Sequence, residues 1–231
     1  IYYNLSQTAS VDNLKTNVTS ALSNYSNDVD MNRFGGRFKY SKVLQLIDRV
    51  DNSITSNITR IRIRRDMKVL KNQFAQYELC FGNKFHVSPN GLNIKSTGFR
   101  IAGESSVVYL TDAPTSDIRY GILSVVKLGE NNEKTVVARE AGTVDYMKGE
   151  IILNTINIVS TVEPNDIIEI QAFPESNDVV GLKDLYLTLD ISNSRINMVK
   201  DVIASGEDIS GVSFTRDYYT SSYSNGSLER K

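Results

Sequence analysis

Histidine and cysteine, two residues that often act as catalytic bases, nucleophiles or metal ligands, are scarce in this sequence, which contains one of each. His86 lies six residues after Cys80. A catalytic dyad needs a base beside a nucleophile, and a zinc site needs several such ligands. No second histidine exists to complete a usual zinc site, so we expect His86 to be a surface or hydrogen-bonded side chain. The sequence therefore predicts no metal, no cofactor and no enzymatic activity.

Carboxylates are plentiful and offer another route to catalysis. Two carboxyl groups a few ångström apart can act as general acid and base, as in glycoside hydrolysis. The sequence alone does not place any two of them side by side or apart, and most such residues lie on solvated strand faces. The sequence contains no tryptophan, the aromatic platform common in carbohydrate sites. It also lacks the glycine motifs of nucleotide-binding loops. A hydrolase therefore remains only an alternative. Its catalytic groups would be carboxylates around the expected hairpins: Asp145, Glu150, Glu163, Asp166 and Glu169.

A row of arginines is the sharpest local feature of the sequence. Arg60, Arg62 and Arg64 alternate with isoleucines, which predicts a strand with one charged and one apolar face. Neighbouring arginines of the row would lie about 6–7 Å apart. The row could pair with local carboxylates, contact an acidic protein surface, or hold phosphates. The net charge of −1 and the lack of tryptophan disfavour nucleic acid, so the functional hypothesis is an acidic protein partner.

The residues before this row predict two helices separated by a glycine turn. Apolar residues recur every three or four positions from Val11 to Val29, with Ser10 as the N-cap. A second helix is expected over residues 41–50, and a strand over residues 58–65. Between the helices, Gly35 and Gly36 break the helical pattern. Residues 1–70 are therefore expected to form a helix-helix-strand unit, and the fold class is predicted as α+β.

From residue 71 the sequence changes to short strands separated by turn signals. This pattern predicts an antiparallel β sandwich or barrel-like domain over residues 71–180. Residues 182–191 predict one more strand, which would return to complete the first unit. Within the remainder of residues 181–231, residues 218–231 lack periodicity and predict a flexible tail. The β strands are expected at residues 77–81, 107–110, 120–128, 134–139, 143–146, 150–153, 156–159 and 166–173.

The overall composition is that of a globular protein, with 40 % hydrophobic and 23 % charged residues. No apolar run approaches the roughly 20 residues that cross a bilayer, so no membrane partner is predicted. A lone cysteine cannot form an internal disulfide, so the fold should not depend on an oxidising compartment. Because the chain starts with Ile1 rather than Met, we expect it to be a fragment of a longer protein.

The segment around the glycine turn carries a family resemblance. Residues 21–25, 32–42, 47–48 and 53–57 resemble the baseplate wedge protein of T4-like contractile-tailed phages, which is related to the baseplate J-like family. The resemblance covers about residues 10–66 and implies the C-terminal part of such a protein. Five positions match the family motif, and we expect them to shape the fold or to contact a neighbouring subunit: Phe34, Gly35, Gly36, Arg37 and Tyr40.

The resemblance implies a structural role in the virion rather than catalysis. It implies homodimers that join a ring around the tail hub, contact other wedge proteins, and help couple baseplate rearrangement to sheath contraction. The expected location is the tail baseplate, after assembly in the host cytoplasm. The alternative is a carbohydrate-binding or receptor-binding β module of a phage tail. The helical opening of the chain and its lack of tryptophan disfavour that alternative.

Overall fold

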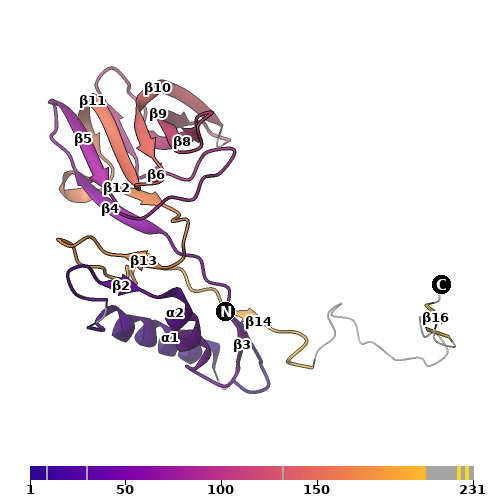
Figure 1. Ribbon diagram of the computed structural model, residues 1–231. Helices are drawn as coiled ribbons and strands as arrows, with labels where there is room; N and C mark the ends of the chain where they lie inside the picture. The colour runs from indigo at the N-terminus through magenta and orange to yellow at the C-terminus, as the bar shows by residue number, and fades with distance from the viewer. Residues whose placement is uncertain (9, 30, 132, 207–222, 225–226, 229–231) are drawn as a thin grey trace. The chain divides into compact units, whose positions relative to one another are not determined.

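A computed structural model describes the chain except residues 9, 30, 132, 207–222, 225–226 and 229–231 (Figure 1). Most of the expected flexible tail at residues 218–231 lies outside the described residues, but its described part forms two short strands, β15 (Tyr223–Ser224) and β16 (Ser227–Leu228), which pair antiparallel. The described part is mostly β, with two α-helices. None of its helices has the length and apolar character needed to cross a membrane.

Contacts divide the chain into two units. Unit 1 comprises Ile1–Ser23, Val43–Ile58 and Asp190–Lys231, and unit 2 comprises Asn24–Lys42 and Thr59–Leu189. Unit 1 contains most of α1 (Val11–Ser26) and of α2 (Tyr40–Asp48), so helices form where the apolar spacing predicts them. The Ser10 hydroxyl accepts a hydrogen bond from the Asn13 amide at 3.4 Å, as expected of an N-cap.

Unit 1 also contains a small sheet that the sequence did not predict. The strand β1 (Tyr2–Tyr3) lies between β3 (Ile54–Ser56) and β14 (Val199–Lys200). It pairs antiparallel with β3 and parallel with β14. Strands of two or three residues show no periodicity, so the chain's return through β14 could not be read from the pattern.

Unit 2 contains a nine-stranded sheet, part of which closes on itself. The strand β8 pairs with β9, β9 with β10, β10 with β11, β11 with β7, and β7 with β8, all antiparallel. This five-strand ring agrees with the barrel-like domain expected from the sequence, and Figure 1 shows β8, β9 and β10 curving together. The nine strands are β4 (Ile63–Lys68), β5 (Phe74–Cys80), β6 (Lys95–Ser96), β7 (Phe99–Ile101), β8 (Val108–Pro114), β9 (Tyr120–Leu128), β10 (Lys134–Asp145), β11 (Glu150–Thr161) and β12 (Ile167–Ala172).

Two pairs of expected strands are in fact single long strands. The strand β10 joins the strands expected at residues 134–139 and 143–146, and β11 joins those at 150–153 and 156–159. Polar and glycine residues between them produce shifts of register rather than turns, between Ala138 and Gly142 in β10 and between Leu153 and Ile156 in β11. Such irregularities bend a strand, as closure of a barrel requires.

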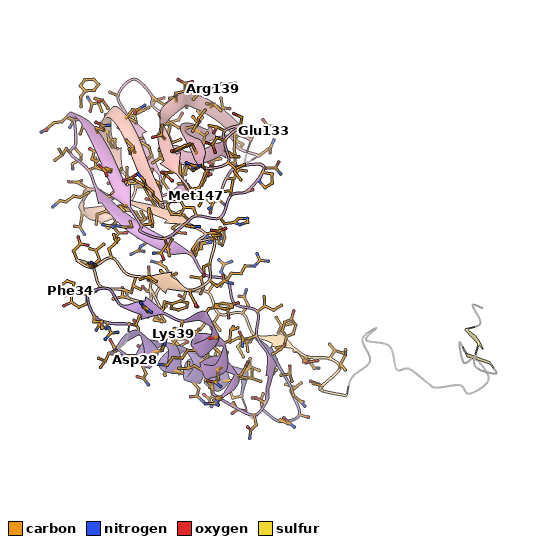
Figure 2. The ribbon with its side chains drawn as sticks, viewed as in Figure 1. Asp28, Phe34, Lys39, Glu133, Arg139 and Met147 are labelled. Carbon is orange, nitrogen blue, oxygen red and sulfur yellow. The ribbon has the colours of Figure 1, made fainter. Side chains whose placement is uncertain are left out.

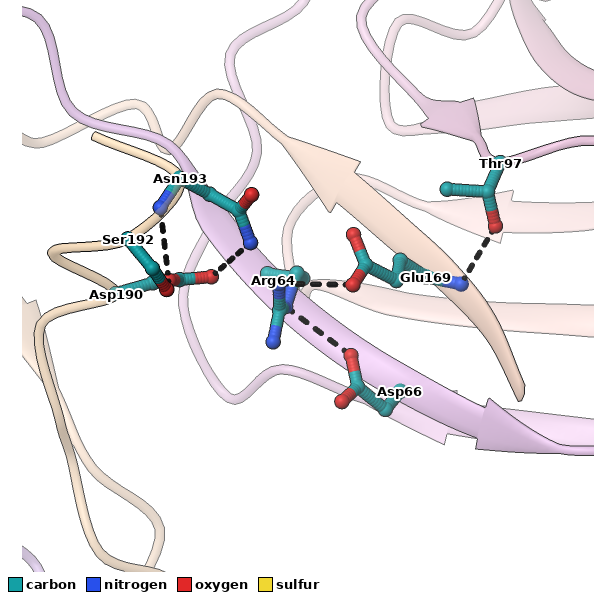
Figure 3. A network of polar contacts seen from close by, with 7 residues as sticks. All are labelled: Arg64, Asp66, Thr97, Glu169, Asp190, Ser192 and Asn193. Carbon is teal, nitrogen blue, oxygen red and sulfur yellow. Dashed lines mark hydrogen bonds and ion pairs between the residues drawn. The ribbon is translucent and has the colours of Figure 1, made fainter. Parts of the chain in front are cut away.

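Two other expected strands are shorter or missing. The strand expected at residues 58–65 begins only at Ile63, because its neighbour β12 ends at Ala172, the partner of Ile63. The next residue on that side, Phe173, bonds through its carbonyl to the His86 amide instead. Residues 182–191 form no strand apart from an isolated bridge between Tyr186 and Phe34. At the end of that segment Asp190 accepts hydrogen bonds from Ser192 and Asn193, which makes a turn (Figure 3).

The core of unit 2 is an apolar cluster built from alternate residues of the long strands. Leu123, Val125, Ile151, Leu153 and Ile170 are fully buried in it. Alternation along β9, β11 and β12 places these side chains inside and leaves the residues between them more exposed. The closed sheet is therefore stabilised mainly by burial of apolar surface.

Candidate interaction surface

The two glycines of the expected motif serve the backbone of the turn between α1 and β2 (Arg37–Phe38). Gly35 has a positive φ of 64°, a conformation that glycine adopts without strain. A Cβ on Gly36 would lie 2.0 Å from the carbonyl oxygen of Met31. The Gly35 amide donates to the Leu182 carbonyl at 3.0 Å, and the Gly36 carbonyl accepts from Gly181 at 2.7 Å. Backbone hydrogen bonds therefore hold the turn against residues 181–182.

The residues after the glycines continue this attachment. The strand β2 pairs antiparallel with β13 (Val179–Val180), and Phe38 is buried with its ring edge against Tyr25. The Tyr40 amide donates to Asp178 at 2.8 Å, and its hydroxyl donates to the Thr59 carbonyl at 2.7 Å. Tyr40 thus joins two distant segments of the chain, whereas Arg37 is exposed.

Phe34 is the apolar motif residue that is exposed to solvent. Its ring lies 4.2 Å, centroid to centroid, from the ring of Tyr186. Phe34 is 58 % exposed and Tyr186 is 54 % exposed. Figure 2 shows Phe34 at the outer edge of its turn. The two rings form an exposed aromatic pair, and backbone hydrogen bonds join the turn that carries Phe34 to residues 181–182.

The three arginines of the basic row have different partners in the structure. Arg64 forms ion pairs with Asp66 at 3.1 Å and with Glu169 at 3.0 Å (Figure 3). Glu169 is itself positioned by β12, where its amide donates to the Thr97 hydroxyl at 3.0 Å. For Arg64, the structure therefore agrees with the first of the three alternatives, in which the row pairs with local carboxylates.

Arg60 and Arg62 have a different environment. Arg62 lies over the ring of Phe173, with its Cζ 4.7 Å from the ring centroid, a cation–π contact. Arg60 lines a hollow together with His86 and Phe173. Both arginines are exposed, and neither forms an ion pair within the described part of the chain.

The remaining candidate residues of the sequence have structural contacts. His86 is exposed, and its backbone is bonded to Phe173 and to Asn93. Cys80 lies in β5, where its carbonyl accepts from the Arg65 guanidinium. The described residues contain no group of three or more His, Cys, Asp or Glu placed to hold a metal ion.

The hairpin carboxylates are engaged locally as well. Asp145 accepts from the amides of Met147 and Lys148, which closes the β10–β11 turn. Asp166 forms an ion pair with Lys71 at 2.8 Å, and Glu150 lies 3.8 Å from Lys148. These contacts give each of the three carboxylates a structural partner.

One buried polar pair was not anticipated. The Tyr146 hydroxyl donates to Asp112 at 2.7 Å, and the Ile94 amide donates to the same carboxylate at 2.7 Å. Burial and the neighbouring Asp112 carboxylate raise the pKa of Tyr146 well above its usual range. Residues 111–114 look like a turn in the sequence, but β8 continues through them. The only signal of this buried pair in the sequence was an aspartate that stands between strand residues.

Comparison with known proteins is informative for the first part of the chain. Residues 1–66 match the family model of baseplate structural protein gp6, C-terminal domain III. This match supports a structural role in the tail baseplate of a bacteriophage. The matched region includes both helices, the glycine turn and the arginine row. No curated protein matches the chain.

Proposed function

We propose that this chain belongs to a wedge subunit of a contractile phage tail baseplate. In this proposal the subunit forms homodimers, joins a ring around the tail hub with other wedge proteins, and helps couple baseplate rearrangement to sheath contraction. The observation that carries the proposal is the family match over residues 1–66, which includes the glycine turn and the exposed Phe34. Assembly would take place in the host cytoplasm and the product would reside in the virion.

The aromatic pair supplies a physical reason for placing a subunit contact at the turn. Aromatic side chains are enriched among the residues that dominate binding energy in interfaces. The pair is more than half exposed, and the hydrogen bonds of Gly35 and Gly36 fix the backbone that carries it. A surface already ordered before association loses little conformational entropy when it binds. Phe34 and Tyr186 are therefore our candidates for the homodimer contact.

Analytical ultracentrifugation of the purified chain over a wide concentration range tests this function. We expect reversible dimers, weakened about tenfold or more by Phe34→Ala, since truncation of an aromatic anchor costs on the order of 2 kcal/mol. Phe74→Ala is the matched control, because Phe74 is an exposed aromatic residue on β5. A monomer at every concentration would contradict the homodimer. Equal weakening by both substitutions would contradict the location of the contact.

A complementation assay tests the wider role. A phage whose wedge subunit carries Phe34→Ala should assemble fewer complete baseplates, as counted by electron microscopy of lysates. Normal numbers of baseplates that contract normally would contradict a function for this surface in assembly.

A further inference from the structure

The surface around Phe173 has features that the motif and its aromatic pair do not explain. Phe173 lines a hollow in unit 2 with Arg60 and His86, and it also lies beside Arg62 and Lys95. We call Arg60, Arg62, Lys95 and Phe173 the Phe173 surface. Its three cations are exposed, and none has an ion-pair partner among the described residues. Glu175 is the acidic residue of that hollow, so positive charge predominates on this surface.

The backbone at this surface is also unpaired. The ladder between β4 and β12 ends at Ile63 and Ala172. Within the described part of the chain, residues 60–62 make no backbone hydrogen bond. Their exposure still alternates, with Arg60 and Arg62 outward and Ile61 less exposed. The segment thus retains the side-chain alternation of a strand and offers free amide and carbonyl groups, which an extended peptide can use.

We propose that the Phe173 surface binds an extended acidic segment of a partner protein. Carboxylates at alternate positions of a strand lie about 6–7 Å apart on one face, which matches the spacing of guanidinium groups two residues apart on residues 60–62. Arg62, Arg60 and Lys95 bind those carboxylates, and the unpaired backbone of residues 60–62 binds the peptide backbone. The stacking of Arg62 on Phe173 holds one guanidinium in place before the partner arrives.

Charge and size favour a peptide over nucleic acid. The chain as a whole has a net charge of −1, so no long-range field attracts a polyanion. Phosphate contacts supply most of the affinity in nucleic-acid binding, and a protein with strongly salt-dependent binding makes about 6–10 of them, whereas the Phe173 surface provides three cations. Arg62 already occupies one face of the Phe173 ring, which leaves less of that ring for stacking on a base. Arg64 is not part of the site, because Asp66 and Glu169 neutralise it.

A fluorescence-anisotropy titration with a synthetic peptide tests the proposal. The probe is a short labelled peptide with glutamate at alternate positions and threonine or valine between them. The comparison peptide has glutamine in place of glutamate. We expect saturable binding of the glutamate peptide, at least about tenfold tighter than the glutamine peptide. Affinity should fall when ionic strength rises from about 0.01 to about 0.15 M, because the Debye length falls from about 30 to about 8 Å.

The variant Arg60→Ala/Arg62→Ala should bind the glutamate peptide at least about tenfold more weakly than the unmodified protein does. The matched control is Arg100→Ala/Arg139→Ala, which removes two other exposed arginines of unit 2 and should change the affinity less than about twofold. Thermal melts confirm that both variants fold. Absence of binding, equal binding of the two peptides, or equal losses in both variants would overturn the proposal. Tighter binding of a single-stranded oligothymidylate would overturn it in favour of nucleic acid.

This inference does not depend on the homodimer. Phe34→Ala should leave peptide affinity unchanged, and Arg60→Ala/Arg62→Ala should leave dimerisation unchanged. Failure of either proposal can therefore be recognised separately.

Discussion

At the scale of single residues, Gly36 has no room for a side chain. An alanine Cβ there would lie 2.0 Å from the Met31 carbonyl oxygen, a backbone atom that cannot rotate away. We predict that Gly36→Ala destabilises the protein by about 2–4 kcal/mol, as strain at a tightly packed backbone does. Urea denaturation followed by circular dichroism measures this change. Gly129→Ala is the control, since its nearest neighbours would lie at 3.7 Å, and it should cost less than about 1 kcal/mol. Similar losses in both variants would show that the glycine turn is not specially constrained.

The buried pair of Tyr146 and Asp112 makes stability sensitive to alkaline pH. The folded-state pKa of Tyr146 is raised above its unfolded value of about 10. Neutral Tyr146 therefore makes its full contribution to the free energy of unfolding below about pH 10, and this contribution is lost as pH rises further. We predict that the urea midpoint falls steeply above about pH 10 and that Tyr146→Phe reduces this fall. At neutral pH, Tyr146→Phe should cost about 1–2 kcal/mol, because Asp112 loses a hydrogen bond.

The control for this pair is Tyr120→Phe, which changes an exposed tyrosine on β9. It should leave the alkaline dependence as in the unmodified protein. Parallel alkaline losses in the unmodified protein and in Tyr146→Phe would contradict the assignment to Tyr146.

At the scale of elements, closure of the sheet depends on β10, which pairs with both β9 and β11. Gly142 lies opposite Leu123 on one side and Leu153 on the other. A Cβ at Gly142 would meet the Ile152 carbonyl oxygen at 2.0 Å. We predict that Gly142→Ala loosens this part of the ring, seen as faster amide hydrogen exchange at residues 121–123 and 150–153. Gly129→Ala, in the loop between β9 and β10, should leave exchange in those segments unchanged. Unchanged exchange in Gly142→Ala would contradict a role for Gly142 in closure.

The same elements explain how far the sequence could be read. The alternation of β-branched and polar residues predicted most long strands and a barrel-like β domain, because alternation is a local property. Gly142 looked like a break between strands, since its partner Leu153 becomes visible only after pairing. At the candidate site, the sequence singled out the glycines and Tyr40 as motif residues, but it did not predict the contacts that they make. Tyr40 bonds to Asp178, 138 residues away, and no local pattern encodes that distance.

At the scale of the whole molecule, acid should weaken unit 1 through two carboxyls. The Asp201 carboxylate accepts from the Thr55 hydroxyl at 2.6 Å and from the Ala204 amide at 3.0 Å. Asp51 accepts from the Ser53 amide at 2.8 Å. These hydrogen bonds lower the pKa of both carboxyls, and both belong to unit 1. A lowered folded-state pKa gives stability that is present above the unfolded value of about 3.9 and is lost as pH falls below it.

The two ends of the pH scale should therefore weaken different units, since the alkaline effect of Tyr146 belongs to unit 2. We predict that native amide resonances around β3 and β14 disappear first in NMR spectra recorded from about pH 6 to about pH 3. In unit 2, Glu104 has a lowered pKa through the Ser106 amide, so acid should affect that loop locally. Asp201→Asn keeps an acceptor for Thr55 but does not titrate, and it should make the loss around β14 less dependent on pH. Simultaneous loss of resonances throughout both units, with the same pH dependence in Asp201→Asn, would contradict this assignment.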